Sequence, residues 1–402
     1  MPEAVIVAAA RSPIGRAFKG SLTTLRPDDM AVQMVQAVLA KVPALDPALI
    51  EDLMVGNAQP AGEAGYNIAR VVALLAGLPH VPGTTVNRYC SSSLQTIRMA
   101  AHAIKAGEGD VFLAGGVEAV SRFGSGMSDG MPNTQNERFA GAHQRTESRG
   151  LGGGPWAPAE GLADAYIEMG QTAENVREIE NVSRQEMDRF AALSQNRAVE
   201  SQTNGFFERE ISPLTLADGT VVESDDGPRP NTTIEGLANL KPVFRPNGEI
   251  TAGNSCPLND GAAAVVVMSD TKAAELGIAP LARIVASGVS ALDPEIMGLG
   301  PVEASRQALG RARMTIADVD LVEINEAFAA QVVPSARSLD IEWDKLNIHG
   351  GAIALGHPFG MTGSRIMATL LNGLEDADAT IGLESMCVGG GQGMAMIVER
   401  LR

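Results

Sequence analysis

The fold is decided by the stretch Val86-Asn87-Arg88-Tyr89-Cys90-Ser91-Ser92-Ser93-Leu94-Gln95. The β-prone residues Gly83 to Val86 run into a cysteine, and apolar residues then recur at helical spacing at Leu94, Ile97, Ala101 and Ile104. This pattern predicts a strand followed by a helix that Cys90 opens and that runs to about Gly107. Free N–H groups and the helix dipole lower the pKa of a thiol at such a turn, which makes Cys90 a candidate nucleophile. The alternative is that Cys90 is a small buried hydrophobic residue.

Two later segments carry the other groups that acyl transfer needs. Gly356-His357-Pro358 follows an apolar run, and Cys387-Val388-Gly389-Gly390-Gly391 lies near the C-terminus. Glycine-dense turns let the backbone approach a ligand and leave its N–H groups free to bind it. An imidazole, two thiols and clustered backbone donors together predict nucleophilic acyl transfer. The alternative for His357, considered apart from the Gly356-His357-Pro358 motif, is a hydrogen-bonded histidine of the core.

The composition is that of a soluble globular protein, with 402 residues of which 45% are hydrophobic and 20% charged. This length suits two or three domains. A net charge of −17 argues against a nucleic-acid partner. It also requires a local basic patch for any polyanionic ligand.

The cysteines and the hydropathy pattern predict a cytoplasmic protein. Three cysteines far apart form no disulfide framework, which favours a reducing compartment. The N-terminal residues lack a basic leader and a long apolar core, so no signal peptide is expected. No run approaches the ~20 apolar residues that a bilayer requires, so no membrane association is expected either.

The first half of the chain alternates between strand and helix patterns. Strands are expected at 4–10, 52–56 and 110–114, the last ending in Gly115-Gly116, and a helix at 27–41. The alternation predicts a layered α/β domain with a mainly parallel sheet. Residues 121–161 are rich in Gly, Ser, Asn, Arg and Pro, and residues 121–250 are expected to form a loop-rich insertion. Within it, Ser183 and Glu186 form a capping-box pattern that starts a helix.

The alternation resumes in the second half and resembles the first. Strands are expected at 284–286, 321–324 and 380–383, and the strand at 262–268 is expected to rejoin the first domain. The order strand, Asn87, Cys90, helix parallels the order strand, Asn325, Glu326, helix, which favours a duplication. The predicted domains are residues 1–120 plus 251–275, residues 121–250, and residues 276–402.

Four short motifs follow one another in the order and spacing of the thiolases, which this chain resembles over essentially its whole length. They read Cys90-Ser91-Ser92, Asn325-Glu326-Ala327-Phe328, Gly356-His357-Pro358 and Cys387-Val388-Gly389. Thiolases are CoA-dependent enzymes that cleave or form 3-ketoacyl-CoA. The resemblance implies an α/β protein with the duplicated, five-layered α-β-α-β-α thiolase fold. It also implies that the insertion is a loop-rich domain covering the CoA and acyl sites.

The resemblance implies a catalytic role for each motif. Cys90 would become acylated, and His357 would accept its proton and then, with a water held by Asn325, stabilise the departing enolate. Cys387 would move the proton at the reacting carbon, and the N–H groups of Cys90 and Gly389 would bind the acyl oxygen. Structural alternatives are a helix cap at Asn325, before a helix that Glu326 begins, and a tight turn at Gly389.

The resemblance also implies a CoA site without a metal or a prosthetic group, CoA being a co-substrate. Arg229 matches a position at the nucleotide end, Ser255 one near pantetheine, and Met169 one that lines the acyl pocket. For Cys256 a structural role is favoured. Two departures from the family pattern, at Ser93 and His349, are expected to alter the packing near the acyl site and the support of the His357 loop.

The implied activity is cleavage of 3-ketoacyl-CoA to acetyl-CoA and a shortened acyl-CoA, by a ping-pong reaction in the degradation of fatty acids or related chains, sterol side chains included. Alternatives are a biosynthetic acetyl-CoA C-acetyltransferase that forms acetoacetyl-CoA, a decarboxylating ketoacyl synthase, and a non-catalytic acyl-CoA-binding subunit. Cys387 and the Asn325 motif argue against the synthase. A homodimer or homotetramer is implied, and a hydratase/dehydrogenase subunit of β-oxidation is a candidate partner.

Overall fold

The central sheet repeats one strand order in the two halves of the chain. The computed structural model describes residues 2–401, and its ten-stranded sheet runs β10-β11-β12-β9-β1-β8-β5-β3-β4, with β2 beside β8. The strands are β1 (Ala4–Arg11), β2 (Gly15–Arg16), β3 (Asp52–Gly56), β4 (Gly83–Val86), β5 (Val111–Ala119), β8 (Asn259–Ser269), β9 (Ala282–Ala291), β10 (Leu321–Ile324), β11 (Ile381–Val388) and β12 (Gln392–Arg400). The halves join where β1 pairs with β9, and reading outward from there gives β8-β5-β3 on one side and β12-β11-β10 on the other.

The expectation of a mainly parallel sheet is wrong. β3 runs parallel to β4 and β5, and β10 runs parallel to β11. β8 is antiparallel to β1 and β5, and β12 is antiparallel to β9 and β11. The turn at Gly389–Gly391 explains part of the difference, because so short a connection joins only antiparallel strands.

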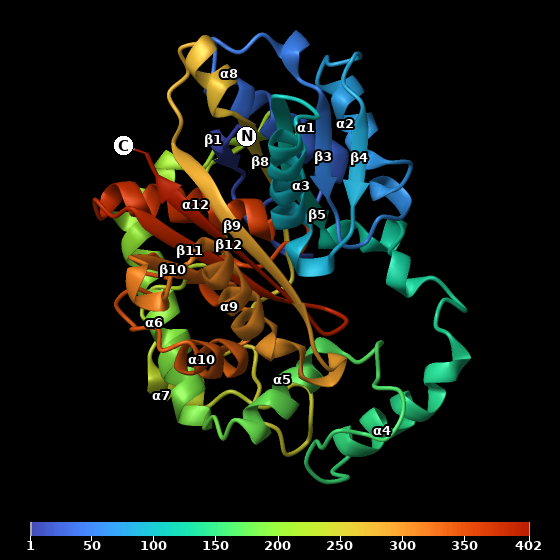
Figure 1. Ribbon diagram of the computed structural model, residues 1–402. Helices are drawn as coiled ribbons and strands as arrows, with labels where there is room; N and C mark the ends of the chain where they lie inside the picture. The colour runs from blue at the N-terminus through green and yellow to red at the C-terminus, as the bar shows by residue number, and fades with distance from the viewer. Residues whose placement is uncertain (1, 402) are drawn as a thin grey trace.

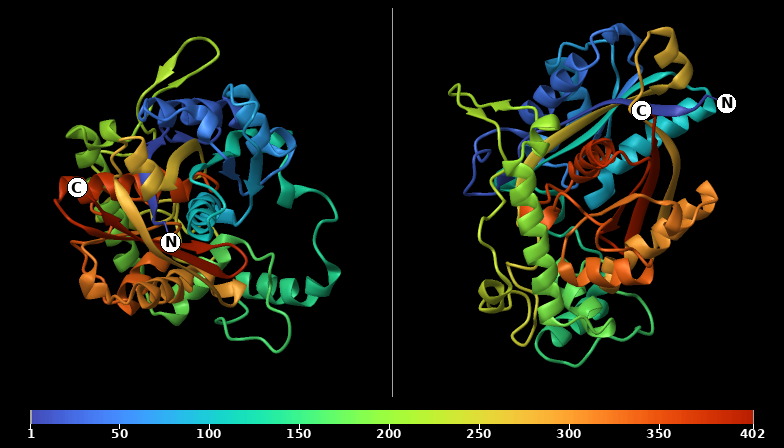
Figure 2. Two further views of the ribbon diagram at one scale, coloured as in Figure 1. Left: turned by 45° about the horizontal axis from the view of Figure 1, so that its top comes forward. Right: turned by 90° about the vertical axis from the view of Figure 1, so that its left-hand side faces the viewer.

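Helices and half-sheets form five layers (Figures 1 and 2). Helices α1 (Pro27–Ala40) and α2 (Ile68–Leu75) cover the outer face of the first half-sheet. Helices α9 (Gly300–Ala312) and α10 (Ala329–Ser338) lie outside the second. Between the half-sheets, α3 (Ser92–Ala106) packs against α12 (Thr362–Asp376), and apolar residues of both helices share one buried cluster with strands of both half-sheets. The Cys90 and His357 motifs come just before these two central helices, and the Asn325 and Cys387 motifs lie at the ends of β10 and β11.

The segment between β5 and β8 contains more helix than its composition indicated. It holds α4 (Ala140–Gly150), α5 (Met169–Ile179), α6 (Arg184–Thr203), α7 (Ile234–Ala238) and a small hairpin of β6 (Leu214–Thr215) and β7 (Val221–Val222). The capping box at Ser183 and Glu186 is present, so the predicted start of α6 is confirmed. The stretch before α5 follows an extended path around α4, at the lower right of Figure 1. Two shorter helices, α8 (Asp270–Glu275) and α11 (Ala352–Leu355), complete the fold.

The sequence predicted that Gly115 and Gly116 end their strand. This prediction is wrong, because β5 continues to Ala119. Both glycines are needed for close packing. A Cβ atom on Gly115 would collide with the Ala263 carbonyl, and one on Gly116 with the Gly360 carbonyl. The second contact brings the chain just after His357 against β5.

The helices between residues 2 and 401 include none that is both long enough and apolar enough to cross a bilayer.

Candidate active site

Cys90 lies in a short 3-10 turn, Tyr89–Ser91, between β4 and α3, so the α-helix begins two residues later than predicted. Its sulfur faces a cavity of about 370 Å³ that Gly389, Met169 and Phe359 also line. The backbone N–H groups of Cys90 and Gly389 are both directed at the sulfur and lower its pKa, but burial outweighs them and raises the pKa to about 11. The expectation of a depressed pKa is therefore wrong, and the resting sulfur is a thiol.

His357 is buried at the end of a left-handed backbone turn that only glycine forms without strain. Gly356 has a φ of +113°, and a Cβ atom there would collide with the Asn259 side chain. Asn259 in β8 accepts a hydrogen bond from the His357 N–H at 3.0 Å and donates one to the Gly15 carbonyl at 3.0 Å. The histidine is thus positioned by a strand from the other half of the molecule.

Thr362 determines which nitrogen of His357 carries the proton. Its Oγ1 lies 2.7 Å from the Pro358 carbonyl oxygen and 2.6 Å from His357 Nδ1. A carbonyl cannot donate, so the single hydroxyl proton points to Pro358 and the oxygen accepts from Nδ1–H. This leaves Nε2 unprotonated, and its lone pair accepts a hydrogen bond from the Asn325 amide. Burial and the nearby Arg365 cation lower the pKa of His357 to about 3, so the ring is neutral.

Asn325 lies beside Nε2 of His357. The alternative, that Asn325 caps a helix, is wrong. Its Nδ2 is 3.3 Å from His357 Nε2, and its Oδ1 is buried with no hydrogen-bond partner among residues 2–401. Helix α10 begins only at Ala329. The intervening residues are extended because Glu326 is held by three donors, the Ser194 hydroxyl at 2.6 Å, the Asn347 amide at 2.8 Å and the Ile353 N–H at 3.1 Å.

Cys387, near the end of β11, brings a second thiol to the same place. The end of β11 contacts the turn at Tyr89–Ser91. Burial raises the pKa of Cys387 well above its usual value, and charge on Cys90 or Cys256 would raise it further, so the three sulfurs are within electrostatic range of one another. Cys256, for which a structural role was favoured, therefore lies close to the other two thiols.

Glu118 is a buried residue of the site that the sequence did not single out. Its carboxylate accepts hydrogen bonds from the Ala58 N–H at 2.8 Å and the Gly360 N–H at 2.9 Å. One side chain therefore ties the loop after β3 to the loop after His357, and both loops line the cavity at Ala58 and Phe359. Burial raises the Glu118 pKa to about 7. The only sequence signal was its place after Gly115-Gly116.

The predicted ligand residues are not all brought together. Met169 lines the cavity over Cys90. Arg229 is exposed elsewhere, its N–H bonded to Gln195 Oε1 at 2.8 Å. Ser255 is buried and donates to the Thr251 carbonyl. Neither is among the residues that line the cavity.

The two departures from the family pattern have separate structural roles. Ser93 Oγ accepts a hydrogen bond from the Ser364 N–H at 2.9 Å and so links α3 to α12. His349 stacks on Phe206 with ring centroids 3.5 Å apart, its Nδ1 lies 3.1 Å from the Ser201 hydroxyl, and burial lowers its pKa to about 4. His349 is therefore a neutral packing residue.

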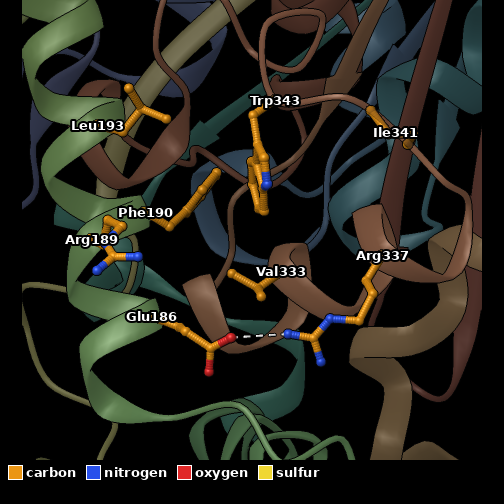
Figure 3. Close-up of a pocket in the computed structure, with 8 residues that line it drawn as sticks. All are labelled: Glu186, Arg189, Phe190, Leu193, Val333, Arg337, Ile341 and Trp343. Atoms are coloured by element: carbon orange, nitrogen blue, oxygen red, sulfur yellow. Dashed lines mark hydrogen bonds and ion pairs between the residues drawn. The ribbon is translucent and has the colours of Figure 1, made fainter.

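A wider groove of about 440 Å³ lies between α6 and α10 (Figure 3). Phe190, Val333 and Trp343 form its apolar wall, and Glu186 and Arg337 form an ion pair across it at 3.0 Å. No thiol or imidazole lines it. The thiol of Cys90 lines the smaller cavity instead, and the chemistry therefore belongs there.

Comparison with known proteins identifies the class. The family model of the thiolase N-terminal domain matches residues 4–271, and that of the thiolase C-terminal domain matches residues 278–400. The chain belongs to the thiolase family, as the sequence motifs predicted, and is an acyltransferase.

Similar proteins narrow this further. The chain is 43% identical to a 3-ketoacyl-CoA thiolase of Saccharophagus degradans over 99% of this chain and 98% of that one. It is 42% identical to a β-ketoadipyl-CoA thiolase of Acinetobacter baylyi, over the full length of both. The crystal structure of the Bacillus anthracis acetyl-CoA acetyltransferase superposes with a TM-score of 0.87 at 38% identity, covering 100% of this chain and 99% of that one. The predicted α/β thiolase fold is confirmed.

Proposed function

We propose that this protein is a degradative 3-ketoacyl-CoA thiolase, which uses CoA to cleave 3-ketoacyl-CoA into acetyl-CoA and a shortened acyl-CoA. The observation that carries the proposal is a cavity in which the Cys90 sulfur meets two backbone N–H groups, and whose lining residue Phe359 packs edge-on against His357, a histidine with an unprotonated Nε2. The names of its relatives support the degradative direction. The biosynthetic reaction is the second candidate, because the similar solved structure is that of an acetyl-CoA acetyltransferase.

In the first half-reaction Cys90 Sγ attacks the 3-keto carbon while its proton passes to His357 Nε2. The bond between C2 and C3 then breaks, leaving an acyl thioester on Cys90 and the enolate of acetyl-CoA. The N–H groups of Cys90 and Gly389, which face the sulfur in the resting enzyme, would bind the acyl oxygen, a contribution of about 3 kcal/mol per donor to transition-state stabilisation. Protonated Nε2 faces the enolate oxygen, and the orphaned Asn325 Oδ1 suits a bound water there.

Cys387 supplies and later accepts the remaining proton of the cycle. Cys387 gives its proton to C2 of the enolate, which releases acetyl-CoA. The resulting thiolate takes the proton of the incoming CoA thiol, and the CoA sulfur attacks the Cys90 thioester. Cys90 leaves as a thiolate and recovers its proton from His357. Each group ends as it began, as a ping-pong cycle requires.

Several finer properties belong to the same proposal. The family resemblance supports CoA contacts at Arg229 and Ser255, and a homodimer or homotetramer. The segment 121–250 would cover the CoA and acyl sites, between halves formed by residues 1–120 with 251–275 and by residues 276–402. The cysteine usage supports a cytoplasmic location and free thiols.

A panel of 3-ketoacyl-CoA esters from acetoacetyl-CoA to long acyl chains tests the function. We expect CoA-dependent cleavage with higher kcat/KM on longer esters than on acetoacetyl-CoA, and slower condensation of acetyl-CoA. Activity confined to acetoacetyl-CoA would favour the biosynthetic candidate. CoA binding without turnover of any ester would leave only an acyl-CoA-binding subunit.

Replacing Thr362 by valine should reduce kcat about 10- to 100-fold, because the buried Nδ1–H loses its acceptor and the tautomer with a free Nε2 is no longer favoured. Thr362→Ser keeps the hydroxyl and should retain most of the activity. Steady-state kinetics of both variants, with melting curves to show that each is folded, make the comparison. Equal kcat values for valine and serine would contradict this role of the hydroxyl.

A further inference from the structure

Two exposed acidic residues are among those that line the cavity over Cys90. Beyond Cys90 and the glycines, its lining includes Gln59, Asp129, Tyr166 and Glu168, and within the described chain no lysine, arginine or histidine lines it. Resting on the proposed function, we propose that this pocket selects 3-ketoacyl-CoA esters with uncharged acyl chains and rejects those that end in a carboxylate.

Asp129 is held in the pocket wall by a reciprocal pair of hydrogen bonds with Gln59. Gln59 Nε2 donates to Asp129 Oδ2 at 2.8 Å, and the Asp129 N–H donates to Gln59 Oε1 at 2.9 Å. The Ser128 hydroxyl also donates to Gln59 Oε1, at 2.9 Å. Burial and Asp129 together raise the pKa of Tyr89, next to the nucleophile, so the carboxylate acts on the reacting end of the pocket as well.

Neither Asp129 nor Glu168 forms an ion pair with a cation in the described part of the chain, and three arginines of the neighbouring segments have other partners. Arg88, two residues before Cys90, is bound to Gln95 at 3.1 Å and to Gln392 at 2.9 Å. Arg122 pairs with Glu63, and Arg149 pairs with Glu295 at 2.9 Å. An acyl carboxylate entering the pocket would therefore lose water and meet like charge without gaining a cation.

The proposed preference for uncharged acyl chains distinguishes this chain from relatives whose names describe a charged acyl chain. The name of the Acinetobacter baylyi protein, β-ketoadipyl-CoA thiolase, describes an acyl chain that ends in a carboxylate. A site for such a chain needs a positive group at its far end, since a carboxylate is held by charge-assisted hydrogen bonds. The pocket described here presents Asp129 and Glu168 instead.

The test uses two esters of equal carbon number, 3-ketohexanoyl-CoA and 3-ketoadipyl-CoA. We expect kcat/KM for the hexanoyl ester to be at least about tenfold higher, a difference of about 1.4 kcal/mol. Raising the ionic strength should narrow this ratio, because both acids are exposed to solvent and salt screens their repulsion of the acyl carboxylate. Both esters carry the same CoA, so salt effects on CoA binding cancel in the ratio.

Asp129→Asn and Glu168→Gln remove one charge each at nearly constant shape, and each should lower the ratio. Asp344→Asn, at an exposed position away from the cavity, is the matched control and should leave the ratio unchanged. Equal or faster cleavage of 3-ketoadipyl-CoA by the wild type would overturn the proposal, as would a ratio that neither pocket variant changes. Failure to cleave either ester would instead overturn the proposed function.

Discussion

Replacing Cys90 by alanine is expected to reduce kcat by a factor on the order of 10⁴ or more, the scale seen when a covalent nucleophile is removed. Without the sulfur no acyl thioester can form, and neither His357 nor Cys387 has a proton transfer to perform. The measurement is intact-mass spectrometry after mixing with a 3-ketoacyl-CoA ester and no free CoA. The wild type should gain the mass of the shortened acyl group, and Cys90→Ala should gain nothing.

Cys256→Ala is the matched control, because Cys256 is a second thiol within range of Cys90 but outside the cavity lining. This variant should keep the adduct, with the acyl group mapped to the peptide that contains Cys90. An adduct on Cys256 or Cys387 in the wild type, or turnover by Cys90→Ala near the wild-type rate, would show that another residue is the nucleophile.

Replacing His357 by glutamine should slow acylation of Cys90 about 10²- to 10⁴-fold, the range of general-base catalysis. Burial raises the pKa of the Cys90 thiol to about 11, so at neutral pH the sulfur needs a base to lose its proton. A neutral imidazole with a free Nε2 is the group that removes this proton as the bond to carbon forms. Single-turnover quench experiments, with adduct formation followed by mass, measure the acylation rate directly.

His80→Gln makes the same change at an exposed histidine remote from the cavity and should leave acylation unaffected. If His357→Gln acylated at the wild-type rate and slowed only the release of product, His357 would serve the enolate alone. The base for Cys90 would then have to be another group of the site.

Local patterns predicted the elements whose signals are contained in a few residues. The strands at 52–56 and 321–324 match β3 and β10 residue for residue, since each is a short apolar run bounded by breaks. The start of α6 was set by a side chain and a backbone group three residues apart. The family and the fold class were predicted from four motifs and are confirmed. The catalytic roles of Cys90, Asn325, His357, Cys387 and Gly389 remain predictions.

Predictions from local patterns were wrong where the contact that decides the structure joins residues far apart in the sequence. Gly115 and Gly116 looked like a strand end, but backbone from β8 and from the loop after His357 is what excludes larger side chains there. The helix expected at Glu326 is absent because donors from α6, Asn347 and Ile353 hold its carboxylate. The depressed pKa expected for Cys90 depended on local N–H groups, whereas burial by distant segments controls it.

The sequence by itself determined the inventory of chemistry: two thiols, an imidazole and glycine-rich turns in a fixed order along an α/β chain. Only the tertiary structure decided that Thr362 directs the proton of His357, that Glu118 joins two loops of the wall, and that Asp129 and Glu168 line the cavity over Cys90. The physical reason is the distance along the chain over which each interaction acts. Helix and strand periodicity arise from neighbours in the chain, but protonation state, tautomer and pocket charge arise from burial and from groups that folding brings together.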